Sequence, residues 1–443
     1  MPEISIRNFS CIQEANIVLR RLNIIIGPQG SGKSVTTKLI YFFSDIHQEV
    51  VRFVEDGVLF SEYKKHVQKM FSIWFPQSAW GGKHFLINYV DGDFSVRVMR
   101  RKSGGKPIDE VTIKFSTSFE SSYGSAADYV EKYKEKRIED IDPLNRGYVR
   151  DDIENSWRMQ EKIREILFRG LNGGVVSSQT FIPAGRAFFT SIGRLVAGIE
   201  HAGSLDPATL KFAKLFANWR DQLEFYLNHF GDDSSERVDA RNRIMNQLFD
   251  GVVQSRRESE FIDMSDGRRV PFSSLSSGQQ ELLPIWYFID NLLTMDAFRS
   301  RSTKRDDSER GKKFVYIEEP EAHLFPQAQS QLLDILVEVV LGGDRSRNLI
   351  LTTHSPYIMS KLNVLLKAGQ ISRRKKKNKE LGAIVDRKKW LQVSDVVAIS
   401  IEDGVVKDIM DREEELIDAA FLDSISNITA MQFSELLDLE DSL

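Results

Sequence analysis

The chain has 443 residues, of which 28% are charged, and its formal net charge at pH 7 is −4. This length allows two or three domains, or one core with a large insertion, and the slightly acidic balance excludes binding to nucleic acid or anionic lipid through overall charge. The single cysteine, Cys11, excludes an internal disulfide, and no signal pattern or membrane-length apolar run is present, so we expect a cytoplasmic protein without a membrane partner.

The first residues predict a β-rich entry to the fold. Ile4–Phe9 and Ala15–Leu19 read as two short strands, and the apolar run Leu22–Ile26 follows as a third. Two alternatives fit Phe9, which either stacks on an adenine ring or is an ordinary core residue.

The segment Gly27–Ser34 has the pattern of a phosphate-binding loop. Glycines at its turns, Gly27 and Gly32, let successive N–H groups close around a β-phosphate at the start of a helix expected over Val35–Phe43. Lys33 is expected to reach the β- and γ-phosphates, and the Ser34 hydroxyl to ligate Mg²⁺. The remaining loop residues expected to contact nucleotide are Gln29, Gly30 and Ser31.

An antiparallel β-subdomain is expected beside this loop. Its predicted segments are Ile73–Phe75, His84–Val90, Phe94–Arg100 and Val111–Phe115, with Asp91-Gly92-Asp93 as a hairpin turn. Gln77 is a candidate for the glutamine that senses the γ-phosphate and Mg²⁺ in some ATPases. A glutamine in a loop is also common without any such role.

Between Gly124 and Gly251 the sequence becomes charged and helix-forming, which predicts a helical subdomain inserted into the core. A short strand and turn at Thr180–Arg186 interrupts it. Arg186 itself either reaches a phosphate or a partner, or is a solvated surface arginine.

A second anion site is predicted after a hairpin around Asp266-Gly267. Leu275–Glu281 precedes an apolar helix in which Pro284 either sets a kink or marks the true start. Hydroxyl and N–H groups at this helix start, with the helix dipole, favour an anion, although the same pattern also serves as a simple N-cap. The residues concerned are Ser276, Ser277, Gly278 and Gln279.

Two further strands end in candidate catalytic residues. The apolar strand Phe314–Ile317 leads into Glu318, assigned to the Mg²⁺ shell, and Glu319, assigned to polarising the attacking water. Another apolar strand ends at His354, which is expected to donate to the γ-phosphate because α/β sheets place ligands at the carboxyl ends of their strands.

The C-terminal part offers less chemistry. The basic run Arg373–Lys379 is either a solvated loop or a contact for nucleic acid or another acidic partner. The tail from Asp411 is acidic, and the stretch through Phe421 is expected to be helical.

In this order, Gly27–Ser34, Leu275–Glu281, Phe314–Glu321 and His354 resemble the motifs of ABC-type ATPases, in the soluble branch of RecF-like and OLD-like AAA-family proteins. The resemblance implies an α/β fold: a P-loop core with an antiparallel β-subdomain and an inserted helical subdomain. It implies ATP and Mg²⁺ as cofactors and a homo-oligomer, at least a dimer, in which Ser276–Gly278 contact the nucleotide held by Lys33 of another copy. The expected divisions are an N-terminal lobe (1–120), the helical insertion (121–260), a C-terminal lobe (261–400) and an acidic tail (401–443).

The function that the resemblance implies is control of a separate effector. OLD proteins carry a Toprim nuclease after the ATPase, and the 89 residues that follow His354 are too few for one. The arrangement resembles the stand-alone ATPase subunits of anti-phage systems such as PARIS or Septu, which pair with a separate nuclease. A RecF-like ATPase that clamps DNA is the alternative, and the helical insertion disfavours a transporter ATPase. Glu318 stands where the family usually has Asp, which leads us to expect slow hydrolysis.

Overall fold

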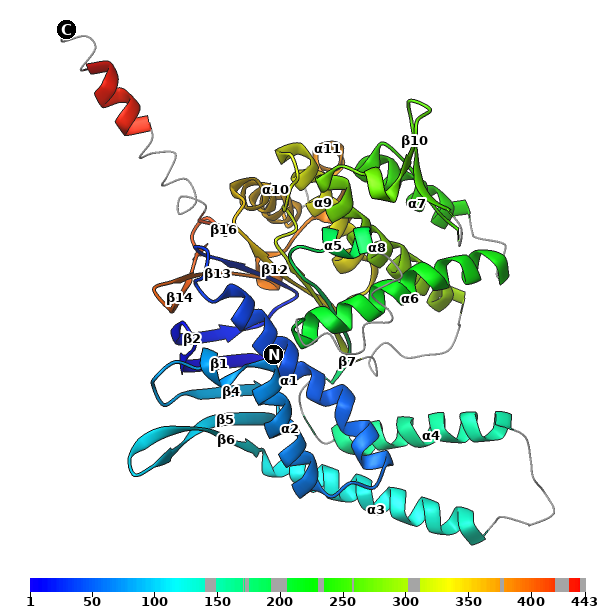
Figure 1. The fold of residues 1–443 in the computed structure, drawn as a ribbon. Coiled ribbons are helices and arrows are strands. Elements are labelled where there is room, and N and C mark those ends of the chain that lie inside the picture. Colours follow the sequence, from blue (N-terminus) through cyan, green and yellow to red (C-terminus); the bar gives the residue numbers. More distant parts are fainter. Residues whose placement is uncertain are drawn as a thin grey trace.

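The computed structural model describes residues 1–139, 149–169, 171, 175–192, 205–229, 235–256, 259–301, 311–374, 378–418 and 430–438. One 11-stranded sheet runs through the molecule in the order β6-β5-β4-β1-β2-β14-β13-β3-β12-β11-β7 (Figure 1). Its strands are β1 (Glu3–Phe9), β2 (Ile12–Val18), β3 (Leu22–Ile26), β4 (Leu86–Asp91), β5 (Phe94–Ser103), β6 (Lys106–Phe115), β7 (Val176–Ile182), β11 (Lys312–Glu318), β12 (Arg347–Thr353), β13 (Val396–Glu402) and β14 (Val405–Asp408).

The half of the sheet from β13 to β7 is parallel, as its short apolar strands predict. β3 lies between β12 and β13, and β11 lies between β12 and β7. Successive residues of these strands enter different hydrophobic clusters: Ile25 and Tyr316 pack with α1 (Lys33–Glu55), whereas Ile24 and Val315 pack with α8 (Ser277–Arg301). Because both faces are covered, the strands are apolar throughout rather than alternating.

The other half is an antiparallel meander with its own aromatic core. β1 pairs with β2 and β4, and β5 joins β4 to β6. The expected strand at Ile73–Phe75 is wrong, because these residues end the helix α2 (Phe60–Trp74). Its buried residues Tyr63, Val67, Phe71 and Trp74 recur at helical spacing, and that period determines the structure.

The region between the two lobes differs from the single helical insertion expected over 121–260. α3 (Thr117–Glu139) and α4 (Val149–Phe168) pack together next to α1, whereas α6 (Pro207–His229) and α7 (Ser235–Phe249) pack against α8 (Figure 1). β7 lies between these pairs in sequence and is the edge strand of the main sheet. The strand that pairs with β7, β11, lies far from it in the sequence, so the pattern of nearby residues cannot predict its place in the sheet.

The second lobe begins with a small antiparallel sheet of β8 (Gly251–Arg256), β9 (Ser259–Met264) and β10 (Arg269–Pro271). The expected hairpin around Asp266-Gly267 joins the last two strands. α8 follows with Pro284 inside it, and the helices α9 (Pro326–Leu336), α10 (Pro356–Ser372) and α11 (Asn378–Ile384) complete this layer.

Residues after 401 belong partly to the core, so the expected tail boundary falls inside β13. β14 pairs with β13 and touches β2, which closes the gap between the two halves of the sheet. The helix expected through Phe421 is wrong for its described part, which forms the strand pair β15 (Met410–Asp411) and β16 (Leu416–Ile417). Its last residues, 419–421, lie outside the described part of the chain.

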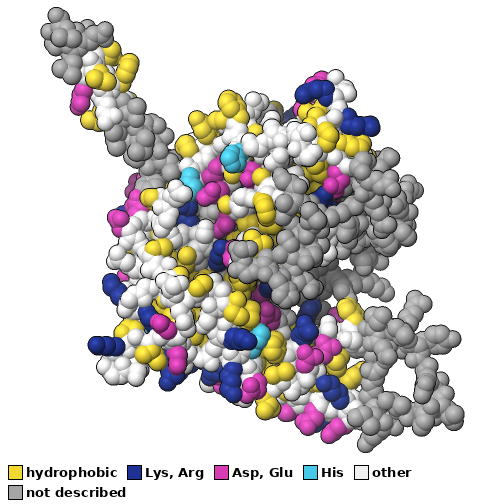
Figure 2. Space-filling model, viewed as in Figure 1, with side chains coloured by type: hydrophobic (Ala, Val, Ile, Leu, Met, Phe, Trp, Pro, Cys, Tyr) yellow, Lys and Arg dark blue, Asp and Glu magenta, His cyan; other side chains and the backbone are white. Residues whose placement is uncertain are grey.

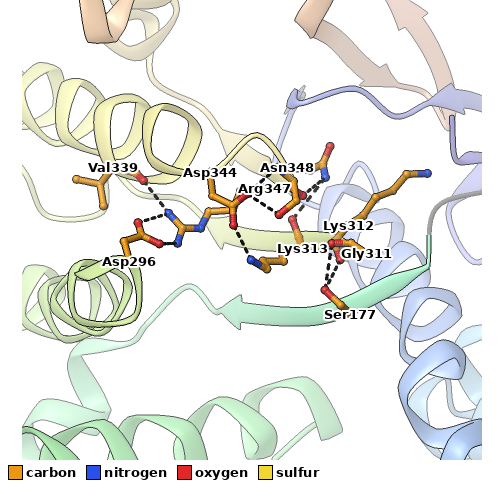
Figure 3. Close-up of polar contacts among 10 residues, drawn as sticks. Ser177, Asp296, Gly311, Lys312, Lys313, Val339, Asp344, Arg347 and Asn348 are labelled. Atoms are coloured by element: carbon orange, nitrogen blue, oxygen red, sulfur yellow. Dashed lines mark hydrogen bonds and ion pairs between the residues drawn. The ribbon is translucent and has the colours of Figure 1, made fainter. Parts of the chain in front are cut away.

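Ion pairs hold the amino ends of the parallel strands (Figure 3). Lys313 pairs with Asp344 at 2.5 Å, and the buried Arg347 pairs with Asp296 and donates to the Val339 carbonyl. The lysine and two local hydrogen bonds lower the pKa of Asp344 despite its partial burial. These contacts lie at the end of the sheet opposite to the expected nucleotide loop.

None of the helices in the described ranges combines the length and apolar character needed to cross a membrane. On the face shown in Figure 2, basic and acidic side chains of the described residues are interspersed, in keeping with the small net charge.

Candidate nucleotide-binding and catalytic site

The loop after β3 has the backbone that a phosphate cradle requires. Gly27 has φ 148°, and a Cβ there would lie 2.4 Å from the carbonyl oxygen of Ile401 at the end of β13. Gly32 has φ 108°, and a Cβ there would lie 3.0 Å from the Cys11 sulfur. Both positions therefore need glycine for conformation and for space. The loop residues Pro28, Gln29 and Gly30 are exposed, and Ser34 is exposed at the start of α1.

Lys33 is held over this loop. Its Nζ donates to the carbonyl oxygens of Gly27 at 2.8 Å and Pro28 at 2.9 Å. Burial lowers the pKa of Lys33, and the charges of Glu319, Glu321 and Glu318 oppose that shift. The lysine and the acids at the end of β11 thus share one electrostatic environment.

Glu318 is the last residue of β11 and is buried. One carboxylate oxygen lies 3.5 Å from the Thr37 hydroxyl on α1, and the other accepts from the backbone N–H of Ala184 at 3.4 Å. The carboxylate is therefore directed toward the first two turns of α1, the helix that carries Ser34 near its start.

Glu319 and His354 come together at the carboxyl ends of neighbouring strands. The Oε1 atom of Glu319 lies 3.5 Å from Nε2 of His354, and both side chains are partly exposed. Glu319 has φ 43°, which is sparsely populated for a residue with a side chain, and its N–H donates to the Thr352 carbonyl at 2.9 Å. The surrounding structure therefore holds this acid in a fixed, unusual conformation.

Glu321 supports His354, a function that the motif reasoning did not assign. Its Oε1 accepts from the Thr353 hydroxyl at 2.8 Å and from the backbone N–H of His354 at 2.6 Å. Ser355 then caps α10 by accepting from the N–H groups of Tyr357 and Ile358. The signal was available in the sequence, since Glu321 is the second acid of the run that follows β11.

The predicted second anion site starts α8, and its side chains form a capping box. Ser276 donates its N–H and hydroxyl to the side-chain oxygen of Gln279, whose own N–H donates back to the Ser276 hydroxyl at 3.3 Å. Ser276 and Ser277 are exposed. Gly278 packs so closely on the loop after β11 that a Cβ would lie 2.9 Å from the carbonyl oxygen of His323.

Both readings of Arg186 are wrong, because the side chain is fully buried. It donates to the carbonyl oxygens of Glu318 at 2.9 Å and Glu281 at 3.0 Å, and at longer distances to those of Glu319 and Pro320. The Glu281 carboxylate lies 3.3 Å from its Nε. Burial lowers the pKa of Arg186, opposed by four nearby glutamates. The local sequence, an arginine after a glycine, is typical of an exposed side chain. These hydrogen-bond partners of Arg186 lie 95 to 134 residues away, so the sequence around it could not indicate them.

The structure also places three other residues or segments singled out in the sequence: Phe9, Gln77 and the basic run. Phe9 is a core residue, packed on Phe71, Phe75 and Phe85. Gln77 begins a short 3₁₀ turn, and its amide donates to the Asp109 carbonyl at 2.7 Å, so its Mg²⁺-sensing function stays a prediction. In the basic run, Arg373 pairs with Glu415, and residues 375–377 lie outside the described part of the chain.

The residues present fit a nucleotide with Mg²⁺. The buried hydroxyl of Ser31 has no hydrogen-bond partner, and the turns at Gly27 and Gly32 leave no room for side chains. Among the described residues, no cluster of three His, Cys, Asp or Glu side chains is suited to hold a metal ion. The exposed Ser34 hydroxyl and the Glu318 carboxylate are oxygen donors of the kind that Mg²⁺ prefers, so these two residues would hold the ion.

Comparisons with solved structures give distant likenesses. These include an SMC head domain from Thermotoga maritima (13% identity, 92% of this chain and 97% of that chain, TM-score 0.35). They also include an Smc head domain with a coiled coil and joint derived from Pyrococcus yayanosii (10% identity, 96% and 100%, TM-score 0.38) and an ADP-state ATP-binding cassette of an ABC transporter (13% identity, 94% and 93%, TM-score 0.30). Scores this low carry no conclusion about function. None of the curated proteins compared with the chain matches it.

A family match covers most of the chain. Residues 22–360, which include the phosphate loop, the start of α8, the β11 acids and His354, match the family described as "AAA domain, putative AbiEii toxin, Type IV TA system". The expected fold class is confirmed, with a mixed α/β P-loop core and an antiparallel subdomain. Since the match spans well over half of its length, the chain belongs to this AAA-domain family.

Proposed function

We propose that the protein binds and slowly hydrolyses ATP with Mg²⁺ in composite sites formed between two copies. One observation carries this proposal. Lys33, Glu319 and His354 converge at the carboxyl edge of the parallel strands, whereas the start of α8 in the same chain packs on the loop after β11 through Gly278. The exposed Ser276 and Ser277 at the start of α8 can then contact the nucleotide bound by a second copy.

Within such a site, Lys33 exchanges its loop carbonyls for phosphate oxygens. Glu319 holds and polarises the attacking water, and His354 donates to the γ-phosphate oxygens on which charge develops. Mg²⁺, when bound through Ser34 and Glu318, neutralises charge on the phosphates.

The test is Glu319→Gln, which keeps the shape of the carboxylate and removes its basicity. ATP should still bind, turnover should fall by about 10²- to 10⁴-fold, and ATP-bound oligomers should accumulate. Glu120→Gln, an exposed glutamate on α3, is the control and should leave turnover unchanged. Wild-type turnover in Glu319→Gln would remove Glu319 from the chemistry.

We further propose that the ATPase acts as a sensor and scaffold for a separate effector, a nuclease or toxin, in anti-phage defence. The support is the toxin-antitoxin description of the matching family, together with the resemblance of the motifs to anti-phage ATPase subunits. If the product of an adjacent gene co-purifies and its activity changes when ATP is added, the proposal holds. ATP-dependent binding to duplex DNA with a steep salt dependence, and no such partner, would favour the RecF-like clamp instead.

A further inference from the structure

Arg186 joins the two motifs that the proposed function brings to different nucleotides. Its guanidinium donates to the carbonyl oxygens of Glu318 and Glu319 in the acidic motif. Its Nε–H donates to the carbonyl oxygen of Glu281 in the first turns of α8, and the Glu281 carboxylate lies beside it. A planar group with five donors can hold all these acceptors in one geometry, which lysine cannot do.

A second contact from the same segment reinforces this junction. Pro284 has no N–H, so the Gln280 carbonyl lacks its partner within α8. The hydroxyl of Thr190, on the short helix α5 (Ala187–Ile192), donates to that carbonyl at 2.9 Å. The carbonyl that Pro284 leaves without a helical hydrogen bond is therefore the one to which the segment after Arg186 is hydrogen-bonded, through Thr190.

We propose that Arg186 is a positioning residue that couples the start of α8 to the catalytic conformation of Glu319. This inference rests on the proposed function, in which Ser276–Gly278 meet the nucleotide of the other copy. A displacement of α8 on that contact reaches Glu319 through the buried guanidinium, since the backbone of Glu319 is held in a left-handed conformation by this arginine and by Thr352. Each copy then hydrolyses its own ATP faster when its neighbour has also bound ATP, and more slowly when the neighbour is empty.

The experiment measures ATP affinity, kcat and the Hill coefficient of hydrolysis in wild-type protein and in Arg186→Lys. The variant keeps the charge and loses the fork, so kcat should fall about 10- to 100-fold while ATP affinity stays within about twofold. The Hill coefficient should exceed 1 in the wild type and fall toward 1 in the variant. Thr190→Val, which removes only the bond to α8, should lower kcat and the Hill coefficient in the same direction.

Arg347→Lys is the matched control. Arg347 is also buried, pairs with Asp296 and donates to the Val339 carbonyl (Figure 3). It starts β12, about 20 Å along the strand from the site. If Arg347→Lys lowers Tm by as much as Arg186→Lys does, it should still leave kcat and the Hill coefficient unchanged.

Equal kinetic losses in Arg186→Lys and Arg347→Lys would reduce Arg186 to a structural residue. An unchanged Hill coefficient in folded Arg186→Lys would overturn the inference, and if that variant does not fold, the same result in Thr190→Val would do so. Either of these kinetic results leaves the proposed function intact. A wild-type protein that does not hydrolyse ATP would overturn the proposed function and this inference together.

Discussion

Nζ of Lys33 makes two hydrogen bonds to carbonyl oxygens of its own loop, and nucleotide binding must exchange them for phosphate oxygens. The lysine is buried and shares its surroundings with three glutamates. Removing its charge would therefore leave bound phosphate facing carboxylates without a counter-charge.

Lys33→Ala should abolish ATP binding. Isothermal titration measures this, with Lys38→Ala as the control. Lys38 lies on the same helix and pairs with Asp206 at 3.3 Å, away from the loop, so its loss should leave affinity unchanged. Unchanged affinity in Lys33→Ala would show that the phosphate-loop assignment is wrong.

Gly278 is a second position where a single residue decides the packing. Because it has no Cβ, the start of α8 can pack closely on the His323 carbonyl. Alanine is the better helix former, yet the steric conflict costs about 1–3 kcal/mol, so Gly278→Ala should lower Tm and slow hydrolysis while ATP still binds. Gly124→Ala in α3, where an added Cβ would meet no atom within 4 Å apart from its chain neighbours and the adjacent backbone of its own helix, should instead raise stability by about 0.5–1 kcal/mol. Thermal melts that rank the two variants the other way would contradict this packing.

At the scale of elements, α1 follows the phosphate loop and carries a half-buried acid, Glu49. Burial, and then the charge of Asp45, raise the pKa of Glu49 to about 7, while Lys211 opposes the shift. The Lys211 ammonium pairs with Asp45 and lies over the Tyr41 and Trp74 rings. The stability of α1 therefore depends on the protonation state of Glu49.

Because the folded state binds the Glu49 proton more tightly than the unfolded chain does, stability should fall as pH rises from about 4.5 to about 7. Glu49→Gln should remove about 1–2 kcal/mol of that fall, allowing for partial solvent screening. Urea unfolding at pH 5 and pH 8 measures it. The same pH dependence in both proteins would refute the assignment to Glu49.

Elements governed by local chemistry could be predicted, and those governed by distant pairing could not. The loop Gly27–Ser34, the capping box at Ser276 and the strand before Glu318 all follow from residues close in sequence. β7 and β13 belong to the core only because they pair with β11 and β3. Arg186 shows the same limit at one residue, since its partners come from segments far along the chain.

At the scale of the whole molecule, the proposed function requires that the two halves of each site come from different copies. The exposed Ser277 starts α8, and Lys33 starts α1 on the other side of the sheet. Ser277→Arg places a bulky cation on an exposed position, so each chain should fold and bind ATP, but two copies should not close on it.

The most direct measurement is ATP hydrolysis after Ser277→Arg and Lys33→Ala proteins, each inactive alone, are mixed and allowed to exchange subunits. In a mixed dimer, one site joins an intact phosphate loop to an intact α8 start, and the other has neither. The account predicts that hydrolysis returns to a fraction of the wild-type rate and that wild-type protein forms at least a dimer by light scattering with ATP and Mg²⁺. A strictly monomeric wild-type protein, with a specific rate independent of its concentration and no activity on mixing, would contradict it.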